Sequence, residues 1–422
     1  MLSKKRILTF SRLSTVLLVV VLFWNCSSSD DPTPSDPIEV EADNDPDPVN
    51  VILGFSACQG GFAGSFPCEN INLMSNIPLS EFAAQRGNDS WGWVDPATGK
   101  EYALMGLNNG TAFIDISAPS SPIYLGKLPS ATGSSNWRDI KVLDNYAFIV
   151  SEADDHGMQV FDLTKLRTVS STPATFEADA LLTDFGSAHN IVINPDSQYA
   201  YAVGADNFEG GPLFINIQDP LNPILEGGYA EGDYTHDAQV VTYTGPDLDY
   251  AGAELFIGSN ENEIVIADIT NKAEPRSIAT ISYADVGYTH QGWFTEDQRF
   301  FILGDELDEV EIGTRSRSII FDFQDLDNPQ IHFEYLGPTF AIDHNGYVLG
   351  NQFYLANYTA GLRITDLSNI AAATMNEVAF FDTVPDSDDP SFTGVWSVYP
   401  YLPSGNIIVS DIAGGLFILQ QQ

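Results

Sequence analysis

Short hydrophobic runs separated by polar turns recur along most of the chain. Runs such as EYALMG, AELFIGSN and RFFILGDE are rich in β-branched and aromatic residues, and Gly, Asn, Asp or Pro residues bound them. A helix would place its hydrophobic residues three and four positions apart, and this spacing is almost absent. The pattern therefore predicts an all-β fold.

The hydrophobic runs group into repeats. Each repeat opens at a histidine or tryptophan, which we call its anchor, and most repeats then contain four runs separated by loops and turns. The aligned anchors are Trp91, Trp137, His189, His236, His290, His344 and Trp396, and the gaps between them are 46, 52, 47, 54, 54 and 52 residues. Four strands in a repeat of about 40–50 residues are typical of a β-propeller blade.

The seventh repeat contains only three runs, whereas an unassigned strand-like run, Ile71–Leu79, precedes the first anchor. An N-terminal strand that completes the last blade would close the ring and remove its open edges. We therefore predict a seven-bladed β-propeller over residues 55–422, closed by this N-terminal strand. A closed ring leaves few edges to pair, so we expect a monomer.

Residues 1–25 have the features of an export signal. Basic residues precede the hydrophobic run Leu17–Trp24, which is short for a transmembrane helix. Cys26 follows directly and resembles the lipidation site of a bacterial lipoprotein, and CSSSDD resembles the export signal of surface lipoproteins of Bacteroidetes. Residues 26–54 are rich in Pro, Asp and Ser and are expected to form a disordered acidic tether. We expect a protein held at the outer membrane or cell surface only by this lipid.

Two further cysteines, Cys58 and Cys68, lie in the sequence CQGGFAGSFPC. In an exported protein, such a pair is expected to form a disulfide that closes a small loop, and here it would fix the start of the N-terminal strand. A metal or redox role is the weaker alternative, because no third soft ligand lies nearby.

The chain is strongly acidic, with 58 Asp and Glu residues against 17 Lys and Arg residues and a net charge of −41. Such a surface repels nucleic acid and anionic lipid, so nucleic-acid binding is excluded. One interpretation is that the acidic surface attracts cations or cationic ligands. The alternative is a solvated surface suited to high ionic strength.

The anchors suggest where a site lies. The first strand of a propeller blade lines the central channel, so the anchors are expected to ring its mouth, with acidic loops on the same face. Imidazole and carboxylate groups suit transition metals, and carboxylates alone suit Ca²⁺. The candidate divalent-metal ligands are His189, His236, His290, His344, Asp305 and Glu306. The candidate ligand-binding residues are Trp91, Trp137, Asp139, Trp396 and Arg315.

Two further expectations concern charged neighbours of the anchors. Asp139, Asp237 and Asp343 flank anchors and are predicted to orient imidazoles through hydrogen bonds. Arg315 or Arg317 would neutralise the acidic run that contains Asp305, or hold a ligand carboxylate. The alternative for each histidine is purely structural, as a hydrogen-bonding post that ties a loop to a strand.

Several linked motifs, among them CQGGFAGSFPCENINLMSNIPL, WGWVDPATGKEYALMGLNNGTAFIDIS, AHNIVIN, YTHDAQ, YTHQGW and NYTAGLRI, resemble the choice-of-anchor B family. Its members are exported bacterial proteins with LVIVD-type repeats. The resemblance covers about residues 55–422 and implies a propeller at the cell surface. It implies no particular activity.

Two classes of function fit these patterns. The first is a surface-anchored binding module whose axial site takes a metal or an unknown small-molecule, glycan or protein ligand. The second is a metal-dependent enzyme, such as a hydrolase, lyase or oxidase, that uses the histidines and acidic loops. The chain contains no GxSxG, HExxH or nucleotide-binding glycine motif. A purely structural surface-layer role is a third hypothesis.

Overall fold

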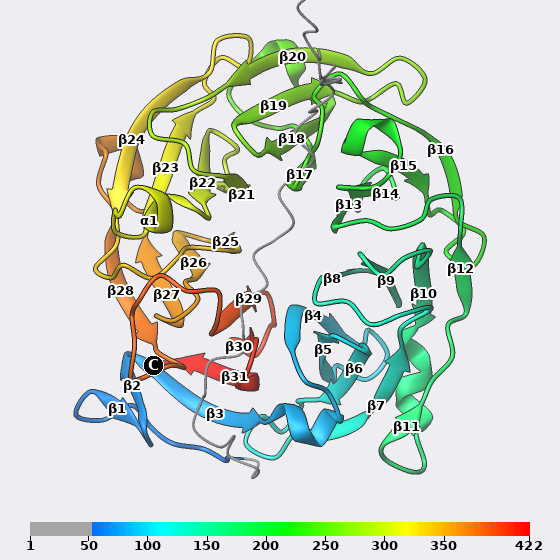
Figure 1. Cartoon of the computed structure of the whole chain (residues 1–422), viewed down its shortest axis with the longest axis vertical. Helices are drawn as coiled ribbons and strands as arrows, with labels where there is room; N and C mark the ends of the chain where they lie inside the picture. The colour runs from blue at the N-terminus through cyan, green and yellow to red at the C-terminus, as the bar shows by residue number, and fades with distance from the viewer. Residues whose placement is uncertain (1–52) are drawn as a thin grey trace, which may run out of the picture. The chain divides into compact units, whose positions relative to one another are not determined.

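The computed structural model describes residues 53–422, which form seven sheets around a common axis (Figure 1). The prediction of a seven-bladed β-propeller is therefore confirmed. The predicted signal peptide, the lipidation site Cys26 and nearly all of the predicted tether lie outside the described residues.

The blades follow one another along the chain, and each runs from an inner strand at the axis to an outer strand. Blades 1 to 3 consist of β4 (Gly87–Val94), β5 (Glu101–Leu107), β6 (Gly110–Asp115) and β7 (Ile123–Pro129); β8 (Arg138–Leu143), β9 (Tyr146–Ser151), β10 (Met158–Asp162) and β12 (Ala180–Leu182); and β13 (Asn190–Asn194), β14 (Tyr199–Val203), β15 (Leu213–Asn216) and β16 (Ile224–Gly228). Blades 4 and 5 consist of β17 (Asp237–Thr242), β18 (Glu254–Asn260), β19 (Glu263–Asp268) and β20 (Arg276–Ile281); and β21 (Thr289–Phe294), β22 (Phe300–Asp305), β23 (Arg317–Asp322) and β24 (Gln330–Leu336).

Blades 6 and 7 are the last two along the chain, and blade 7 contains strands from both ends of the propeller. They consist of β25 (Gly346–Leu349), β26 (Gln352–Ala356), β27 (Leu362–Asp366) and β28 (Asn376–Phe381); and β29 (Val395–Tyr399), β30 (Asn406–Asp411), β31 (Gly415–Gln421) and β3 (Ile71–Ile77). Three short strands extend outer edges, with β11 (Ala174–Thr175) on blade 1 and the hairpin of β1 (Phe62–Ala63) and β2 (Phe66–Glu69) on blade 6. The helical segments are α1 (Asp308–Glu311) and the 3-10 turns Leu79–Phe82, Leu163–Thr168, Phe208–Gly210, Leu248–Tyr250 and Ile370–Ala372.

The core lies between neighbouring blades. Successive side chains of a strand point to opposite faces, so a strand inside the ring buries both of its faces. In β5, Ala103, Met105 and Leu107 pack toward blade 7, while Tyr102 and Leu104 pack toward blade 2. This two-sided burial explains why the hydrophobic runs in the sequence are continuous rather than alternating.

The ring closes as predicted. The N-terminal strand β3 pairs antiparallel with β31 and becomes the outer strand of blade 7 (Figure 1). Upstream of β3, Leu53 and Ser56 form bridges with Asn76 and Leu73, so this segment runs along the outside of β3.

The predicted disulfide between Cys58 and Cys68 is present, with an S–S distance of 2.07 Å. Cys58 follows the segment beside β3 of blade 7, and its backbone N–H donates to Asn72 Oδ1 at 2.9 Å. Cys68 lies in β2, where it pairs with Phe381 of blade 6. The bond therefore does more than fix the start of β3, because it joins the outer edge of blade 6 to that of blade 7.

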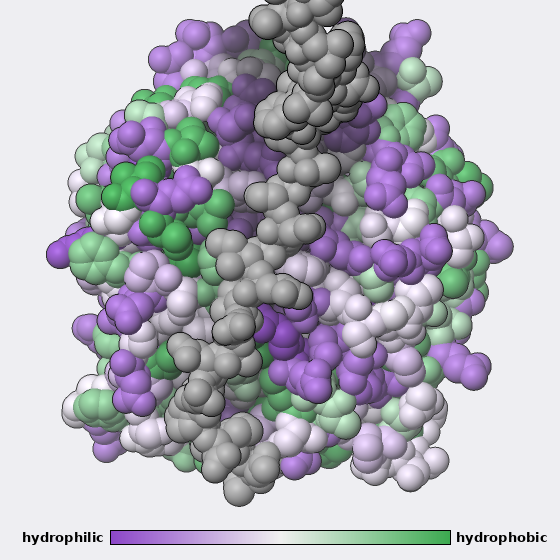
Figure 2. Space-filling model, viewed as in Figure 1, coloured by the Kyte–Doolittle hydropathy of each residue, from purple (hydrophilic) through white to green (hydrophobic). Residues whose placement is uncertain are grey.

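Hydrophilic residues cover much of the face seen in Figure 2, and hydrophobic residues form a smaller group on its left side. Within residues 53–422, no helix is long and hydrophobic enough to cross a membrane.

Candidate metal and ligand site at the axis

Six of the seven anchors stand at the start of an inner strand. Trp137, His189 and His236 directly precede β8, β13 and β17. His290 and Trp396 are the second residues of β21 and β29, where each lies at a shift in strand register. Loops between second and third strands meet this end of the blades, since Glu152 reaches His189 and Glu306 reaches His290.

The prediction that Trp91 opens its strand is wrong. Trp91 lies within β4 and pairs with Leu104, three residues beyond a register shift at Asn88 and Asp89. Asn88 is thus the residue of blade 1 that corresponds to the other anchors. Trp91 instead belongs to an aromatic group deeper along the axis, with ring centroids 4.9 Å from Tyr399 and 5.8 Å from Tyr347.

The four anchor histidines form a continuous arc. Ring centroids are 4.1 Å apart for His189 and His236, 4.3 Å for His236 and His290, and 4.3 Å for His290 and His344. Trp396 continues the arc at 4.8 Å from His344. Neighbouring blades bring these rings together, as the sequence alignment predicts.

Backbone carbonyls set the tautomers of two of the imidazoles. Nδ1 of His236 lies 3.2 Å from the carbonyl oxygen of His290, and Nδ1 of His344 lies 2.6 Å from that of Trp396. Because a carbonyl oxygen only accepts, each Nδ1–H donates, and Nε2 of the neutral ring keeps its lone pair. An imidazole held in this way is prepared to bind a metal through Nε2.

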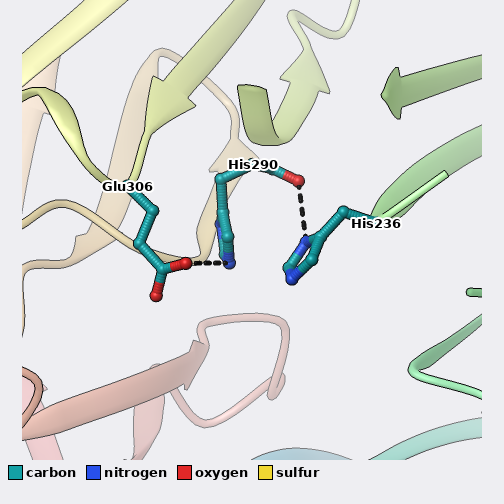
Figure 3. A group of neighbouring side chains, drawn as sticks. All are labelled: His236, His290 and Glu306. Carbon is teal, nitrogen blue, oxygen red and sulfur yellow. Dashed lines mark hydrogen bonds and ion pairs between the residues drawn. The ribbon is translucent and has the colours of Figure 1, made fainter. Parts of the chain in front are cut away.

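Glu306 supplies a carboxylate at the same place. Nε2 of His290 and Nε2 of His344 each lie 3.5 Å from one of its oxygens, and the hydroxyl of Tyr358 donates to Oε1 at 2.8 Å. Ligand atoms of His236, His290 and Glu306 all lie within 4.8 Å of one another (Figure 3). Small side-chain rotations would allow one ion to contact all three.

Burial controls the protonation of this arc. It lowers the pKa of His236 and His290 well below the usual value and that of His344 to about 3, so these rings are neutral at neutral pH. Burial also raises the pKa of Glu306 to about 7. For His189, burial acts to lower the pKa, but the 2.5 Å hydrogen bond and the charge of Glu152 outweigh it and raise the pKa.

The other predicted metal ligand, Asp305, has a different environment. Its oxygens accept hydrogen bonds from the hydroxyl of Tyr283 and from the backbone N–H groups of Gly287, Tyr288 and Leu307, at 2.6–3.2 Å. These bonds hold the loop that precedes β21 against the loop that carries Glu306.

The two arginines of the sequence GTRSRS, at residues 313–318, also differ in their surroundings. Arg315 is exposed, with its guanidinium 5.6 Å from the ring centroid of Phe340. Arg317 is buried and pairs with one carboxylate of the acidic run, since its Nε donates to Asp308 Oδ2 at 2.6 Å.

The prediction that Asp139, Asp237 and Asp343 orient the imidazoles is wrong. Within residues 53–422, hydrogen bonds orient three imidazoles of the arc through other partners, which are the carbonyl of His290 for His236, the carbonyl of Trp396 for His344, and Glu152 for His189. Asp139 instead accepts from the buried ammonium of Lys141 at 2.5 Å and from the backbone N–H of Ile191 at 2.7 Å. Asp237 accepts from its neighbour Ala238, and Asp343 faces other carboxylates.

His156 has a structural role outside the arc. Its Nε2 accepts from the guanidinium of the buried Arg138 at 3.0 Å, and its Nδ1–H donates to the carbonyl of Gly157 at 2.9 Å. Burial, and then the charge of Arg138, lower the pKa of His156 to about 4. The folded protein therefore holds this ring neutral where an unfolded chain would protonate it.

This pair predicts a pH dependence of stability. The ordinary pKa of histidine is about 6.5. The contribution of neutral His156 to the free energy of unfolding is therefore fully present above that pH, and it falls by about 3 kcal/mol as the pH drops to 4. A His156→Gln variant keeps a hydrogen-bond acceptor for Arg138 but does not titrate. Urea denaturation from pH 7.5 to 4 should show a steeper loss for the wild type than for the variant, and parallel curves would contradict the prediction.

The fold and the repeats define this chain as a β-propeller repeat protein. The LVIVD repeat matches it at residues 100–128, 250–281 and 347–383. No curated protein matches the chain.

Solved structures resemble the fold at low identity. Hydrazine synthase of Kuenenia stuttgartiensis is 12% identical with a TM-score of 0.51, covering 76% of this chain and 92% of its own. The Cps50 (Swd1) β-propeller domain of Myceliophteria thermophila is 10% identical with a TM-score of 0.51, covering 80% and 97%. A putative 6-phosphogluconolactonase of Bacteroides fragilis is 12% identical with a TM-score of 0.51, covering 78% and 94%. These likenesses concern the fold alone.

Proposed function

We propose that this protein is a lipid-anchored surface propeller that binds its ligand through a divalent transition metal held by His236, His290 and Glu306. The observation that carries the proposal is the convergence of these three groups within 4.8 Å at the axis. The lipid anchor at Cys26 rests on the sequence pattern around that residue.

The chemistry of the three groups suits such an ion. Two imidazole nitrogens and one carboxylate oxygen form a common set for Zn²⁺, and related sets bind Fe²⁺ and other first-row metals. Three protein ligands leave at least one coordination position for an oxygen or nitrogen atom of a ligand. His344 and Tyr358 contact Glu306, and Trp396 lies against both of them, so the three rings supply an aromatic wall for the rest of that ligand.

The ligand that fits this arrangement is a Lewis base attached to a flat or apolar group. A carboxylate or hydroxyl of a small molecule, glycan or protein would bind the metal, while an adjacent ring or sugar face would pack on Trp396. The many acidic residues of the chain would attract the cation to the site.

Metal analysis tests the proposal. Purified protein loaded with Zn²⁺ and then dialysed should retain about one equivalent, and His236→Ala or His290→Ala should weaken Zn²⁺ binding by at least 10-fold because each removes a ligand. His332→Ala is the matched control, since His332 lies on the outer strand β24 and its Nε2 donates to the carbonyl of Ile370 at 2.9 Å. Equal Zn²⁺ affinity in all four proteins would overturn the proposal.

A further inference from the structure

A second group of metal-capable side chains lies between blades 5 and 6, and its candidate ligand atoms are all carboxylate oxygens. Asp308 and Glu309 come from α1, and Asp343 precedes the anchor His344. One oxygen from each lies within 4.8 Å of the others. The exposed fractions of Asp308, Glu309 and Asp343 are 0%, 2% and 0%. Three acidic groups are thus held together out of contact with solvent.

Most of the oxygens in this cluster accept no hydrogen bond. Within residues 53–422, Oδ1 of Asp308, both oxygens of Glu309 and both oxygens of Asp343 are buried without a donor. Buried carboxylates almost always have donors or counter-ions, because leaving them without either is costly in free energy. The cluster therefore requires either a cation or bound protons.

Within residues 53–422, one positive charge, that of Arg317, pairs with this cluster. Arg317 donates from Nε to Oδ2 of Asp308 at 2.6 Å, and its other nitrogens bond the carbonyls of Ala284 and Asp285. Its remaining ion pairs are longer, at 3.8 Å to Asp305 and 3.4 Å to Glu334. The guanidinium is therefore aimed away from Glu309 and Asp343. Burial and the neighbouring carboxylates raise the pKa of both of those groups.

Gly304 of β22 makes room for the cluster. A Cβ atom on Gly304 would lie 2.7 Å from Oδ2 of Asp343, closer than real contacts allow. The glycine thus permits the carboxylate of blade 6 to lie directly against the backbone of blade 5.

We propose that Asp308, Glu309 and Asp343 form a binding site for Ca²⁺. Ca²⁺ binds oxygen ligands at about 2.3–2.6 Å, so ligands on opposite sides of the ion are about 4.8 Å apart, and it tolerates irregular coordination. Mg²⁺ requires a regular octahedron and retains several waters, which a buried site of this kind disfavours. The site is separate from the His236, His290 and Glu306 group and does not depend on the function proposed above.

The position of the site indicates its role. The loop that begins with Glu306 continues into Asp308 and Glu309, and Asp343 is followed by His344. A cation here ties that loop of blade 5 to the start of blade 6. At the axis, Oε1 of Glu306 lies 3.5 Å from Nε2 of His344. A cation in the carboxylate cluster would fix the positions of both residues through their neighbours in the chain.

Thermal unfolding with and without Ca²⁺ tests the proposal. Protein stripped with chelator should gain about 3–6 °C in Tm when Ca²⁺ is added at about 100 times its Kd, and calorimetry should give one equivalent per chain. Asp343→Asn and Glu309→Gln keep the size of each side chain and remove its charge. Each should weaken Ca²⁺ binding by at least 10-fold and therefore reduce the Tm shift at the same Ca²⁺ concentration to about half or less.

Two controls separate this site from others. Asp325→Asn alters an exposed acidic group with Asp247 and Asp327, and it should keep the full Ca²⁺ response. His290→Ala should lose the transition metal but keep the Ca²⁺ response, so failure of one proposal does not imply failure of the other. If the wild type ignores Ca²⁺ while Asp343→Asn raises Tm in chelator, protons alone satisfy the cluster and the proposal is overturned. Loss of the response in Asp325→Asn would also overturn it, because the ion would then bind at the surface.

Discussion

Replacing Lys141 with methionine is expected to lower the free energy of unfolding by about 3–5 kcal/mol, because it leaves buried carboxylates without their cation. The side chain of Lys141 is 8% exposed, and its ammonium lies 2.5 Å from Asp139 and 3.4 Å from Asp89. It also lies 4.6 Å from the ring centroid of Trp91. Burial opposes its charge, but Asp139 and Asp89 outweigh burial and raise the pKa of Lys141. Urea denaturation followed by tryptophan fluorescence measures the loss.

Lys100 provides the matched control for Lys141. Its ammonium pairs with Asp115 at 2.7 Å, but its side chain is 51% exposed. Lys100→Met should therefore cost less than about 1 kcal/mol. The double variant Lys141→Met with Asp139→Asn should recover part of the loss, since one unpaired charge is removed together with the lysine. A cost for Lys141→Met as small as that of Lys100→Met would contradict the expectation.

Removing the strand that closes the ring is expected to prevent cooperative folding. In β3, Ile71, Leu73 and Ile77 are 0%, 2% and 0% exposed, and they contribute to the cores on both faces of blade 7. Burial of three such side chains contributes about 6 kcal/mol, which is comparable with the whole stability of many domains. A chain that begins at residue 80 also leaves the edge of β31 without a partner.

Circular dichroism and binding of a hydrophobic dye measure this effect. The chain from residue 80 should show no sharp thermal transition and should bind the dye strongly, while a chain from residue 53 should melt as the full chain does. A cooperative transition in the shorter chain, within a few degrees of the control, would show that the ring does not need this strand.

The fold could be predicted because its physical signals are repeated. Seven similar sets of hydrophobic runs give seven blades, and a blade with three runs requires a strand from elsewhere, which Ile71–Ile77 supplies. Trp91 shows where this reasoning fails. The register shift at Asn88 and Asp89 depends on hydrogen bonds between β4 and β5, which the sequence alone does not reveal. Trp91, three residues after Asn88, has a local sequence that resembles those of the other anchors.

The site was only partly predictable for a related reason. Repeat symmetry brings the four histidines together, but the carbonyls of His290 and Trp396 that orient two of them carry no residue-type signal. Lys141 was missed, although strand alternation places it on the same face as Asp139, two residues earlier. That spacing within WRDIKV is the signal that could have revealed the pair.

The closure of blade 7 has a consequence for how the protein is made. Asn76 of β3 donates to the carbonyl of Leu416 across 340 residues of sequence. During synthesis, the earlier of these two strands emerges long before its neighbour exists, so the circle can be completed only after nearly all of the propeller has been translated. Until then β3 lacks the strand β31 with which it pairs, and a chaperone has this interval in which to hold the chain open.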